Sequence, residues 1–177
     1  MNESNMEDKL IIRKMELKDV SRVREIDLAS FSLPWPERSF RFEITDNPAS
    51  RLWVAETIDA QGQLLVIGMV VMWLVIDEAH IGTFAIHPDY RGKGIGQNLL
   101  SESLSEAYRM GVRLCYLEVR RSNIAAQNLY EKFGFKVTSI RSGYYRDNSE
   151  DAMMMTLDPI DVDRLHKLNS LAITKTE

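Results

Sequence analysis

Residues 84–96 read FAIHPDYRGKGIG, and this stretch decides the fold because it joins a strand to a helix. The strand is predicted over 79–87, and the helix continues to about Met110 with Ile95 and Leu99 on one apolar face. Glycines in the connection let the backbone approach an anion, and the helix N-terminus adds free N–H groups and a partial positive charge. The stretch therefore predicts an anion-binding loop made by Arg91, Gly92, Lys93, Gly94, Ile95 and Gly96.

Two familiar phosphate-binding loops do not fit these residues. A P-loop needs Ser or Thr after its lysine, whereas Lys93 is followed by Gly94. A dinucleotide-binding fingerprint would place its third glycine at Gln97. Glu118 lies 24 residues after Gly94, near the place where dinucleotide-binding proteins carry an acid for the ribose. A nicotinamide-dependent dehydrogenase therefore stays open as an alternative.

The rest of the chain alternates between strand and helix patterns. Hairpins come early and strand–helix units follow, which is typical of a mixed sheet. The predicted order is β-α-α-β-β-β-α-β-α-β-β, a single-domain α/β fold whose mixed central β-sheet is flanked by helices. Strands are predicted over 10–15, 51–58, 63–76, 79–87, 112–119, 135–140 and 152–157, and helices over 20–30, 36–44, 95–110 and 123–133.

The length of 177 residues favours one domain. We expect a frayed N-terminus over 1–9, the folded domain over 10–158 and a C-terminal tail over 159–177. A short helix in that tail is indicated by the spacing of its apolar residues, Val162, Leu165 and Leu168.

Composition excludes several kinds of protein. A single cysteine, Cys115, cannot form a disulfide within the chain. Three scattered histidines beside it do not have the spacing of a zinc site, so we expect no metal. The net charge of −4 argues against direct nucleic-acid binding by broad phosphate neutralisation, and it suits a basic peptide or amine as partner.

Hydropathy indicates neither a leader nor a membrane span. Residues 1–9 are polar, unlike a secretory leader. The longest apolar run, 64–76, has thirteen residues, whereas a membrane helix needs about 20. We therefore expect a cytoplasmic protein that does not enter a membrane.

The motif Arg91-x-x-Gly94-x-Gly96 resembles the pyrophosphate loop of the GNAT superfamily of N-acetyltransferases. The preceding residues 84–90 look like the fourth strand of that fold and its exit. The segments 117–123 and 126–135 are similar to the later motif of the superfamily. The resemblance covers about residues 10 to 157.

Within this superfamily the chain is most similar to the RimI-type ribosomal-protein-alanine N-acetyltransferases. The shared features are a Pro-Trp pair after the first helix, a Leu-Glu-Val-Arg strand, a tyrosine pair and a following Glu-Asp-Ala, at residues 34–35, 117–120, 144–145 and 150–152. The chain departs from these relatives at Gly143, where they often carry Asn, and in a longer tail after Asp158.

The resemblance implies transfer of an acetyl group from acetyl-CoA to the N-terminal alanine of a small-subunit ribosomal protein, presented as a basic peptide. It makes Glu118 the base, acting directly or through a water, and Tyr130 the acid that protonates the leaving thiolate. Asn123 lies two helical turns before Tyr130 and is expected to bind the cofactor from the same face.

The resemblance also implies two further groups of residues. The N–H groups of a bulged fourth strand stabilise the oxyanion, at Phe84, Ala85 and Ile86. The walls of the peptide groove are the aromatic residues Trp35, Tyr144 and Tyr145.

Simpler interpretations stay open. Glu118 can be an exposed glutamate at a sheet edge, Tyr130 a core residue beside Phe133, and Asn123 a helix N-cap. The three aromatic residues of the groove can be ordinary packing. The same chemistry on a lysine side chain or a small amine, and an acyl-CoA sensor without turnover, are alternatives for the whole protein, and its oligomeric state is not predicted.

The remaining candidate residues are assigned to structure. Alternation along the strand points Cys115 away from the face of Glu118, as a small core residue rather than a nucleophile. The histidines are interpreted as structural or surface residues, at His80, His87 and His166.

Overall fold

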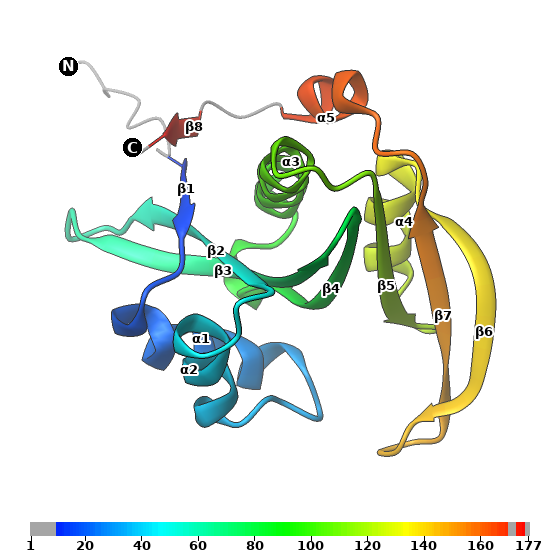
Figure 1. Cartoon of the computed structure of the whole chain (residues 1–177). Coiled ribbons are helices and arrows are strands. Elements are labelled where there is room, and N and C mark those ends of the chain that lie inside the picture. Colours follow the sequence, from blue (N-terminus) through cyan, green and yellow to red (C-terminus); the bar gives the residue numbers. More distant parts are fainter. Residues whose placement is uncertain (1–9, 170–172, 176–177) are drawn as a thin grey trace.

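The computed structural model of the chain describes residues 10–169 and 173–175. Within them, one sheet has the strand order β6-β7-β5-β4-β3-β2-β1-β8 (Figure 1). The strands are β1 (Leu10–Lys14), β2 (Ser50–Ile58), β3 (Leu64–Val75), β4 (Glu78–Ile86), β5 (Leu114–Arg120), β6 (Lys136–Tyr145), β7 (Glu150–Leu157) and β8 (Ile173–Lys175). The helices are α1 (Val20–Ser30), α2 (Glu37–Thr45), α3 (Ile95–Arg109), α4 (Ile124–Phe133) and α5 (Val162–Leu168), with 3₁₀ turns η1 (Leu17–Asp19) and η2 (Pro88–Tyr90).

The predicted element order is confirmed from β1 to β7, and the sheet is mixed. β4 with β5 and β1 with β8 pair in parallel, while the other neighbours are antiparallel. The 3₁₀ turns and β8 were not predicted. β6 continues past the predicted 135–140 to Tyr145. The sequence did not reveal its end, because the strand is exposed almost throughout and its side chains show no alternation between buried and exposed. The frayed start expected over 1–9 lies outside the described residues.

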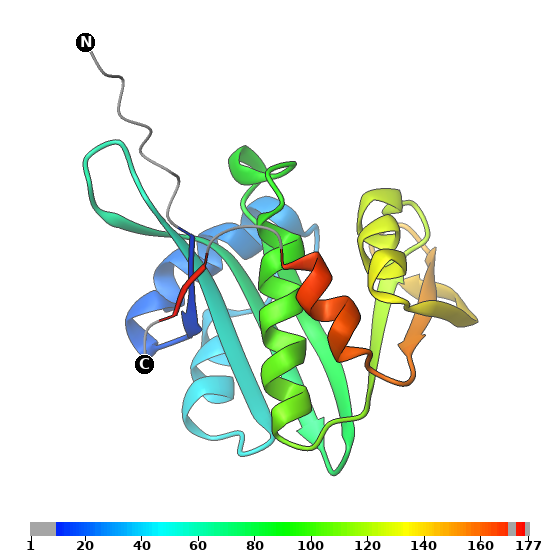
Figure 2. The same cartoon turned by 90° about the horizontal axis from the view of Figure 1, so that it is seen from above.

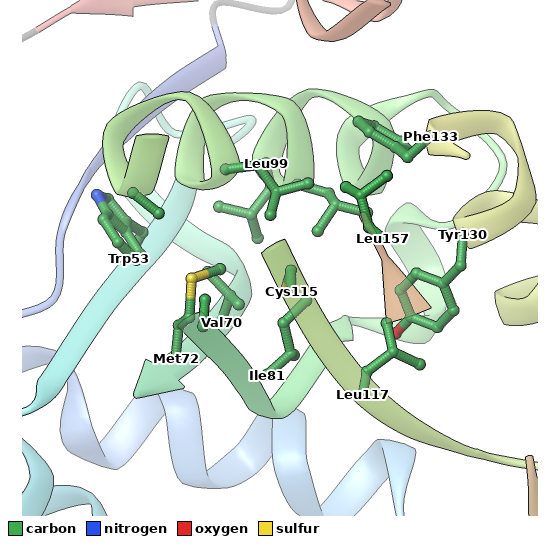
Figure 3. Packing of buried hydrophobic residues seen from close by; sticks show 14 of the residues in the cluster. Trp53, Val70, Met72, Ile81, Leu99, Cys115, Leu117, Tyr130, Phe133 and Leu157 are labelled. Atoms are coloured by element: carbon green, nitrogen blue, oxygen red, sulfur yellow. The ribbon is translucent and has the colours of Figure 1, made fainter. Parts of the chain in front are cut away.

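Helices cover both faces of the sheet. α3 runs along one face over β2, β3 and β4 with α5 beside it (Figure 2), and α1 and α2 pack on the other face (Figure 1). Side-chain alternation divides the core accordingly. Leu99 of α3 and Met72 of β3 belong to one cluster (Figure 3), while Val23 of α1, Phe40 of α2 and Val71 of β3 belong to the other. None of the described helices is long and apolar enough to cross a membrane.

β4 and β5 are hydrogen-bonded neighbours along only part of their length. Their parallel register pairs Glu78–Ile81 with Leu114–Leu117 and ends there. β4 nevertheless continues beside β3 to Ile86, and β5 continues beside β7 to Arg120. The two strands therefore separate beyond this point, and the gap leaves one backbone edge of each strand without a neighbouring strand.

A β-bulge bends β4 where this separation begins. Val71 faces Thr83 and Met72 faces Ile81, so Gly82 is the extra residue on β4. A Cβ atom on Gly82 would lie 2.7 Å from the Trp73 ring, so the close approach of strand and indole requires glycine. A bulge is thus present in the strand where one was expected, but it lies at Gly82, two residues before Phe84, the first of the residues named for their N–H groups.

The segment after Asp158 packs on the domain through α5. Ser101 Oγ donates a hydrogen bond to the Leu165 carbonyl at 2.7 Å, and Gln97 Nε2 donates to the Leu168 carbonyl at 2.7 Å. The Leu165 side chain is fully buried in the cluster under α3. These contacts join α5 to the helix that begins at the glycine loop.

Candidate active site

A cavity of about 850 Å³ occupies the gap between β4 and β5. Its walls come from the α1–α2 connection, β4, the glycine loop with the start of α3, β5, α4 and Tyr145. These segments are far apart in the sequence and meet because the sheet opens between its two parallel central strands. Most of the predicted site residues line this cavity, while Lys93 and Tyr144 do not.

The glycine loop forms one end of the cavity. Gly92 and Gly94 have φ angles of +77° and +80°, which lie in the left-handed region that favours glycine. α3 begins directly after them at Ile95, so its first-turn N–H groups have no acceptor within the helix. Arg91 Nε donates to the Ile86 carbonyl at 2.9 Å, which ties the loop to β4. Lys93 instead lies over the Tyr90 ring, at 5.4 Å from its centroid.

Backbone alternation decides which β4 amides face the gap. The His87 N–H donates to the Ile67 carbonyl at 2.8 Å. Because hydrogen-bonded pairs alternate along an antiparallel ladder, the Ala85 amide also points to β3, while the amides of Phe84 and Ile86 point away from it. Of the three predicted donors, only these two face the cavity.

Glu118 lies at the point where β5 leaves β4. Cys115, Leu117 and Val119 are buried in the core, so alternation turns Glu118 to the opposite face. Its side chain is 15% exposed, and Oε2 lies 2.6 Å from His80 Nε2. The interpretation as an exposed edge glutamate is therefore wrong. Burial raises the pKa of the Cys115 thiol, in keeping with its assignment as a core residue.

His80 is the residue that sequence reasoning missed. It was assigned to structure, but its ring bonds to the candidate base. The parallel register sets His80 beside Tyr116, and Glu118 follows two residues later on the same face. Only this pairing could have revealed the contact, because the two residues are 38 positions apart.

Tyr130 comes from α4 and is buried, at 6% exposure. Its ring packs on Phe84 and Phe135, with centroids 6.3 and 5.6 Å away, and lies beside Leu117 in Figure 3. Among the described residues, no protein group forms a hydrogen bond with its hydroxyl. Burial raises the pKa of this phenol, which keeps it protonated. Tyr130 is thus both a core residue and a protonated group on the cavity wall.

Asn123 caps α4. Its Oδ1 accepts a hydrogen bond from the Ala126 N–H at 3.2 Å, as the N-cap interpretation predicted. The residue also lies on the cavity wall. Its side-chain amide nitrogen, which does not take part in the cap, remains available to a ligand.

Aromatic residues form another part of the cavity wall. Trp35 and Tyr145 line it. Trp35 stacks on Trp73 with the ring centroids 6.1 Å apart. Tyr144 is 44% exposed and meets Tyr145 edge-on, at 5.2 Å, outside the cavity wall. Two of the three residues expected to wall the peptide groove therefore line the cavity, and their contact with a peptide stays a prediction.

Arg120 links the α1–α2 connection to the turn between β6 and β7. Its place in the Leu-Glu-Val-Arg motif did not reveal this role. Its guanidinium lies 3.8 Å from the Tyr145 ring centroid and pairs with Asp147 at 2.8 Å and Glu150 at 3.2 Å. Ser32, from the α1–α2 connection, bonds to both Arg120 and Asp147. The Ser122 N–H donates to Glu150 at 2.6 Å. Hydrogen bonds from Ser122 first, and then from Asn148 and Arg120, lower the pKa of Glu150 to about 2.

Comparisons with known proteins agree with this architecture. A model of the acetyltransferase (GNAT) family matches residues 20–135. A Bacillus subtilis protein, described as a proposed [ribosomal protein bS18]-alanine N-acetyltransferase, is 40% identical over 150 residues, covering 85% of this chain and 96% of the relative. The [ribosomal protein bS18]-alanine N-acetyltransferase of Escherichia coli K12 is 33% identical over 148 residues, covering 82% of this chain and 95% of the relative.

A solved structure extends the similarity to three dimensions. The crystal structure of the ribosomal-protein-S18-alanine N-acetyltransferase from Escherichia coli matches with a TM-score of 0.75 and 31% identity, covering 86% of this chain and 94% of that one. The glycine loop, the gap between β4 and β5 and the family match all fall in the same part of the chain. The chain therefore belongs to the GNAT family of acetyltransferases.

Proposed function

We propose that this protein transfers an acetyl group from acetyl-CoA to the α-amino group of the N-terminal alanine of ribosomal protein bS18. The observation that carries the proposal is that Glu118 and Tyr130 line one cavity whose end is the glycine loop. The names of the relatives at 40% and 33% identity support the acceptor. A protein with this task works where ribosomes are made, so we place it in the cytoplasm.

The cavity fits acetyl-CoA. A volume of about 850 Å³ falls in the range of pockets that hold ligands of cofactor size. The turn at Gly92 and Gly94 and the first N–H groups of α3 form a cradle for the pyrophosphate, with Arg91 beside it. The amides of Phe84 and Ile86 are free to bond the rest of the molecule along β4. Acetyl-CoA supplies the activated thioester, and residues of the chain orient the reacting groups and transfer the protons.

Glu118 accepts the proton that the acceptor amine must lose. An α-amino group has a pKa of about 8, compared with about 10.4 for lysine, so a carboxylate needs to give an α-amine only modest help. His80 holds the Glu118 carboxylate in place. The proton passes directly or through one water.

Tyr130 donates a proton to the departing sulfur. Its phenol is kept protonated by burial, and its hydroxyl is free of protein partners among the described residues. A β4 amide, from Phe84 or Ile86, stabilises the negative oxygen that forms when the amine attacks. The remaining part of the acceptor, a basic segment, lies along the part of the wall formed by Trp35 and Tyr145.

The proposal is tested by mass spectrometry of matched peptides. The purified protein is mixed with acetyl-CoA and a basic peptide that starts with alanine. A second peptide has the same sequence with a blocked N-terminus and free lysines. One acetyl group on the free N-terminus alone supports the proposal. Acetylation of the blocked peptide moves the substrate class to lysine, and product on neither peptide contradicts the assignment.

A further inference from the structure

The segment Pro34-Trp35-Pro36 carries Trp35 of the cavity wall. Its backbone has few hydrogen-bonding groups that could hold the segment. Proline has no N–H group, so Trp35 carries the only amide donor of the three residues. The segment belongs to the irregular connection between α1 and α2. Its position must therefore come from groups outside it.

Two side chains of α1 hold both polar groups of the Trp35 backbone. Asp27 Oδ2 accepts a hydrogen bond from the Trp35 N–H at 2.6 Å. Arg24 Nη1 donates to the Trp35 carbonyl. Arg24 and Asp27 are three positions apart on α1, so they project from one face of the helix. We call this arrangement the Trp35 clamp.

Asp27 is an unusual choice for a merely structural bond. The residue is fully buried, and its Oδ1 has no hydrogen-bond partner among the described residues. Burying a carboxylate in this way is costly, because its second oxygen has no partner that replaces the lost water. Burial raises the pKa of Asp27 to about 6 even though Arg24 and the Trp35 N–H favour its ionised form. Such a cost is consistent with a role in function.

The clamp acts on the cavity through the Trp35 indole. The indole stacks on Trp73 and tilts against Phe40, with centroids 6.1 and 5.4 Å away, and lines the cavity. Trp73 is itself held by Glu43, which accepts from its Nε1 at 2.8 Å. The Trp35 side chain is thus supported by two aromatic rings, and its backbone is held by α1.

We propose that Asp27 and Arg24 are positioning residues that set the affinity for the acceptor by fixing Trp35 at the wall of its groove. This inference rests on the proposed function, in which Trp35 contacts the acceptor. It predicts that loss of the clamp weakens acceptor binding and leaves acetyl-CoA binding and the chemical step intact.

A readout independent of activity is the ¹⁹F spectrum of the protein labelled with fluorotryptophan. The chain has three tryptophans, and Trp35→Phe identifies the resonance of Trp35. Asp27→Ala should shift and broaden this resonance. The resonance of Trp53, which is buried elsewhere in the core, should stay unchanged. An unmoved Trp35 resonance would overturn the clamp even if the protein proved inactive on every peptide.

Kinetics then test the link to the acceptor. With the alanine-starting peptide, Asp27→Ala should raise the peptide KM about tenfold, while kcat and the acetyl-CoA KM change less than about twofold. Asp27→Asn keeps an oxygen for the Trp35 N–H and should restore most of the affinity. Glu25→Ala, on the exposed face of the same helix, is the matched control. Arg24→Ala combined with Asp27→Ala should raise the peptide KM by no more than about the larger single effect, because both side chains hold the backbone of the same residue, Trp35.

These measurements separate the two proposals. If the wild-type protein modifies neither α-amines nor lysines, the proposed function fails. The ¹⁹F spectrum then tests by itself whether Asp27 fixes the position of Trp35. If the wild-type protein is active and Asp27→Ala leaves the peptide KM unchanged, or weakens acetyl-CoA to the same degree, the positioning role is wrong.

Discussion

Side chains of β5 show how a single residue position decides between core and chemistry. Cys115 and Glu118 are three positions apart, and alternation sends the thiol into the core and the carboxylate into the gap. At the same scale, burial keeps the Tyr130 phenol protonated. The proposed base, Glu118, thus lies on the gap face of β5 beside His80, whereas the proposed acid, Tyr130, is buried on α4.

The proposed roles predict a separation of turnover from cofactor binding. Glu118→Gln and Tyr130→Phe should each lower kcat by about 10²- to 10⁴-fold, the usual worth of a positioned proton-transfer group. Acetyl-CoA affinity should change less than about threefold, since each substitution keeps the shape of the side chain. Steady-state kinetics with a cofactor titration measures both quantities. Equal losses in kcat and affinity for Tyr130→Phe would make Tyr130 a binding residue instead.

His80 should matter less than the base that it holds. His80→Ala removes the bond to Glu118 and should lower kcat about tenfold, because the carboxylate loses one orienting partner. His80→Gln, which retains a donor, should recover part of the rate. In a Glu118→Gln background, His80→Ala should have little further effect on kcat. Full additivity of the two losses would exclude a shared role.

Asp27 predicts a pH-dependent difference in stability. Burial raises its pKa from 3.8 in the unfolded chain to about 6 in the folded protein. The folded state therefore binds more protons between these values, and its free energy of unfolding falls as the pH rises through them. Asp27→Asn should remove this fall. The free energy of unfolding of the variant, measured relative to wild type, should therefore be higher at about pH 7 than at about pH 4. Urea unfolding at both pH values measures the difference, and an equal offset at both would contradict it.

At the scale of elements, the start of α3 couples backbone geometry to ligand binding. Gly94 is the N-cap of this helix with a φ of +80°. Alanine in the left-handed region costs about 1–2 kcal/mol. Gly94→Ala should therefore lower stability by about that amount and weaken acetyl-CoA binding, leaving the peptide KM unchanged.

Calorimetric titration with acetyl-CoA and urea unfolding test this prediction together. Gly94→Asn should be milder, because asparagine tolerates the left-handed region better than alanine. Glu106→Ala, a half-buried position later in α3, controls for helix propensity. Unchanged cofactor affinity in Gly94→Ala would show that the loop does not hold the pyrophosphate.

At the scale of the whole molecule, the segment after the expected domain end is joined to the core. Leu165 of α5 is fully buried against α3. Leu165→Ala should lower the free energy of unfolding by about 2–5 kcal/mol, as for other buried leucines. Lys167→Ala, exposed on the same helix, should change it by less than about 0.5 kcal/mol. Urea unfolding compares the two, and similar small effects would make α5 a dispensable tail.

Local patterns in the sequence determined much of this protein. Alternation and helical spacing predicted the order of the elements from β1 to β7, and the glycines at 92, 94 and 96 marked the start of α3. Alternation also separated Cys115 from Glu118 before any fold was known. These features depend on residues within a few positions of one another, so the backbone geometry that causes them is visible in the sequence.

Only the tertiary structure decided which distant side chains meet. The parallel register of β4 and β5 brings His80 to Glu118, and the same two strands then separate to open the cavity. Arg120 joins two loops through Ser32, and Asp27 holds Trp35 across a connection without regular structure. Strand register, bulges and loop paths depend on how the whole chain packs, and no periodicity within a single segment records that packing.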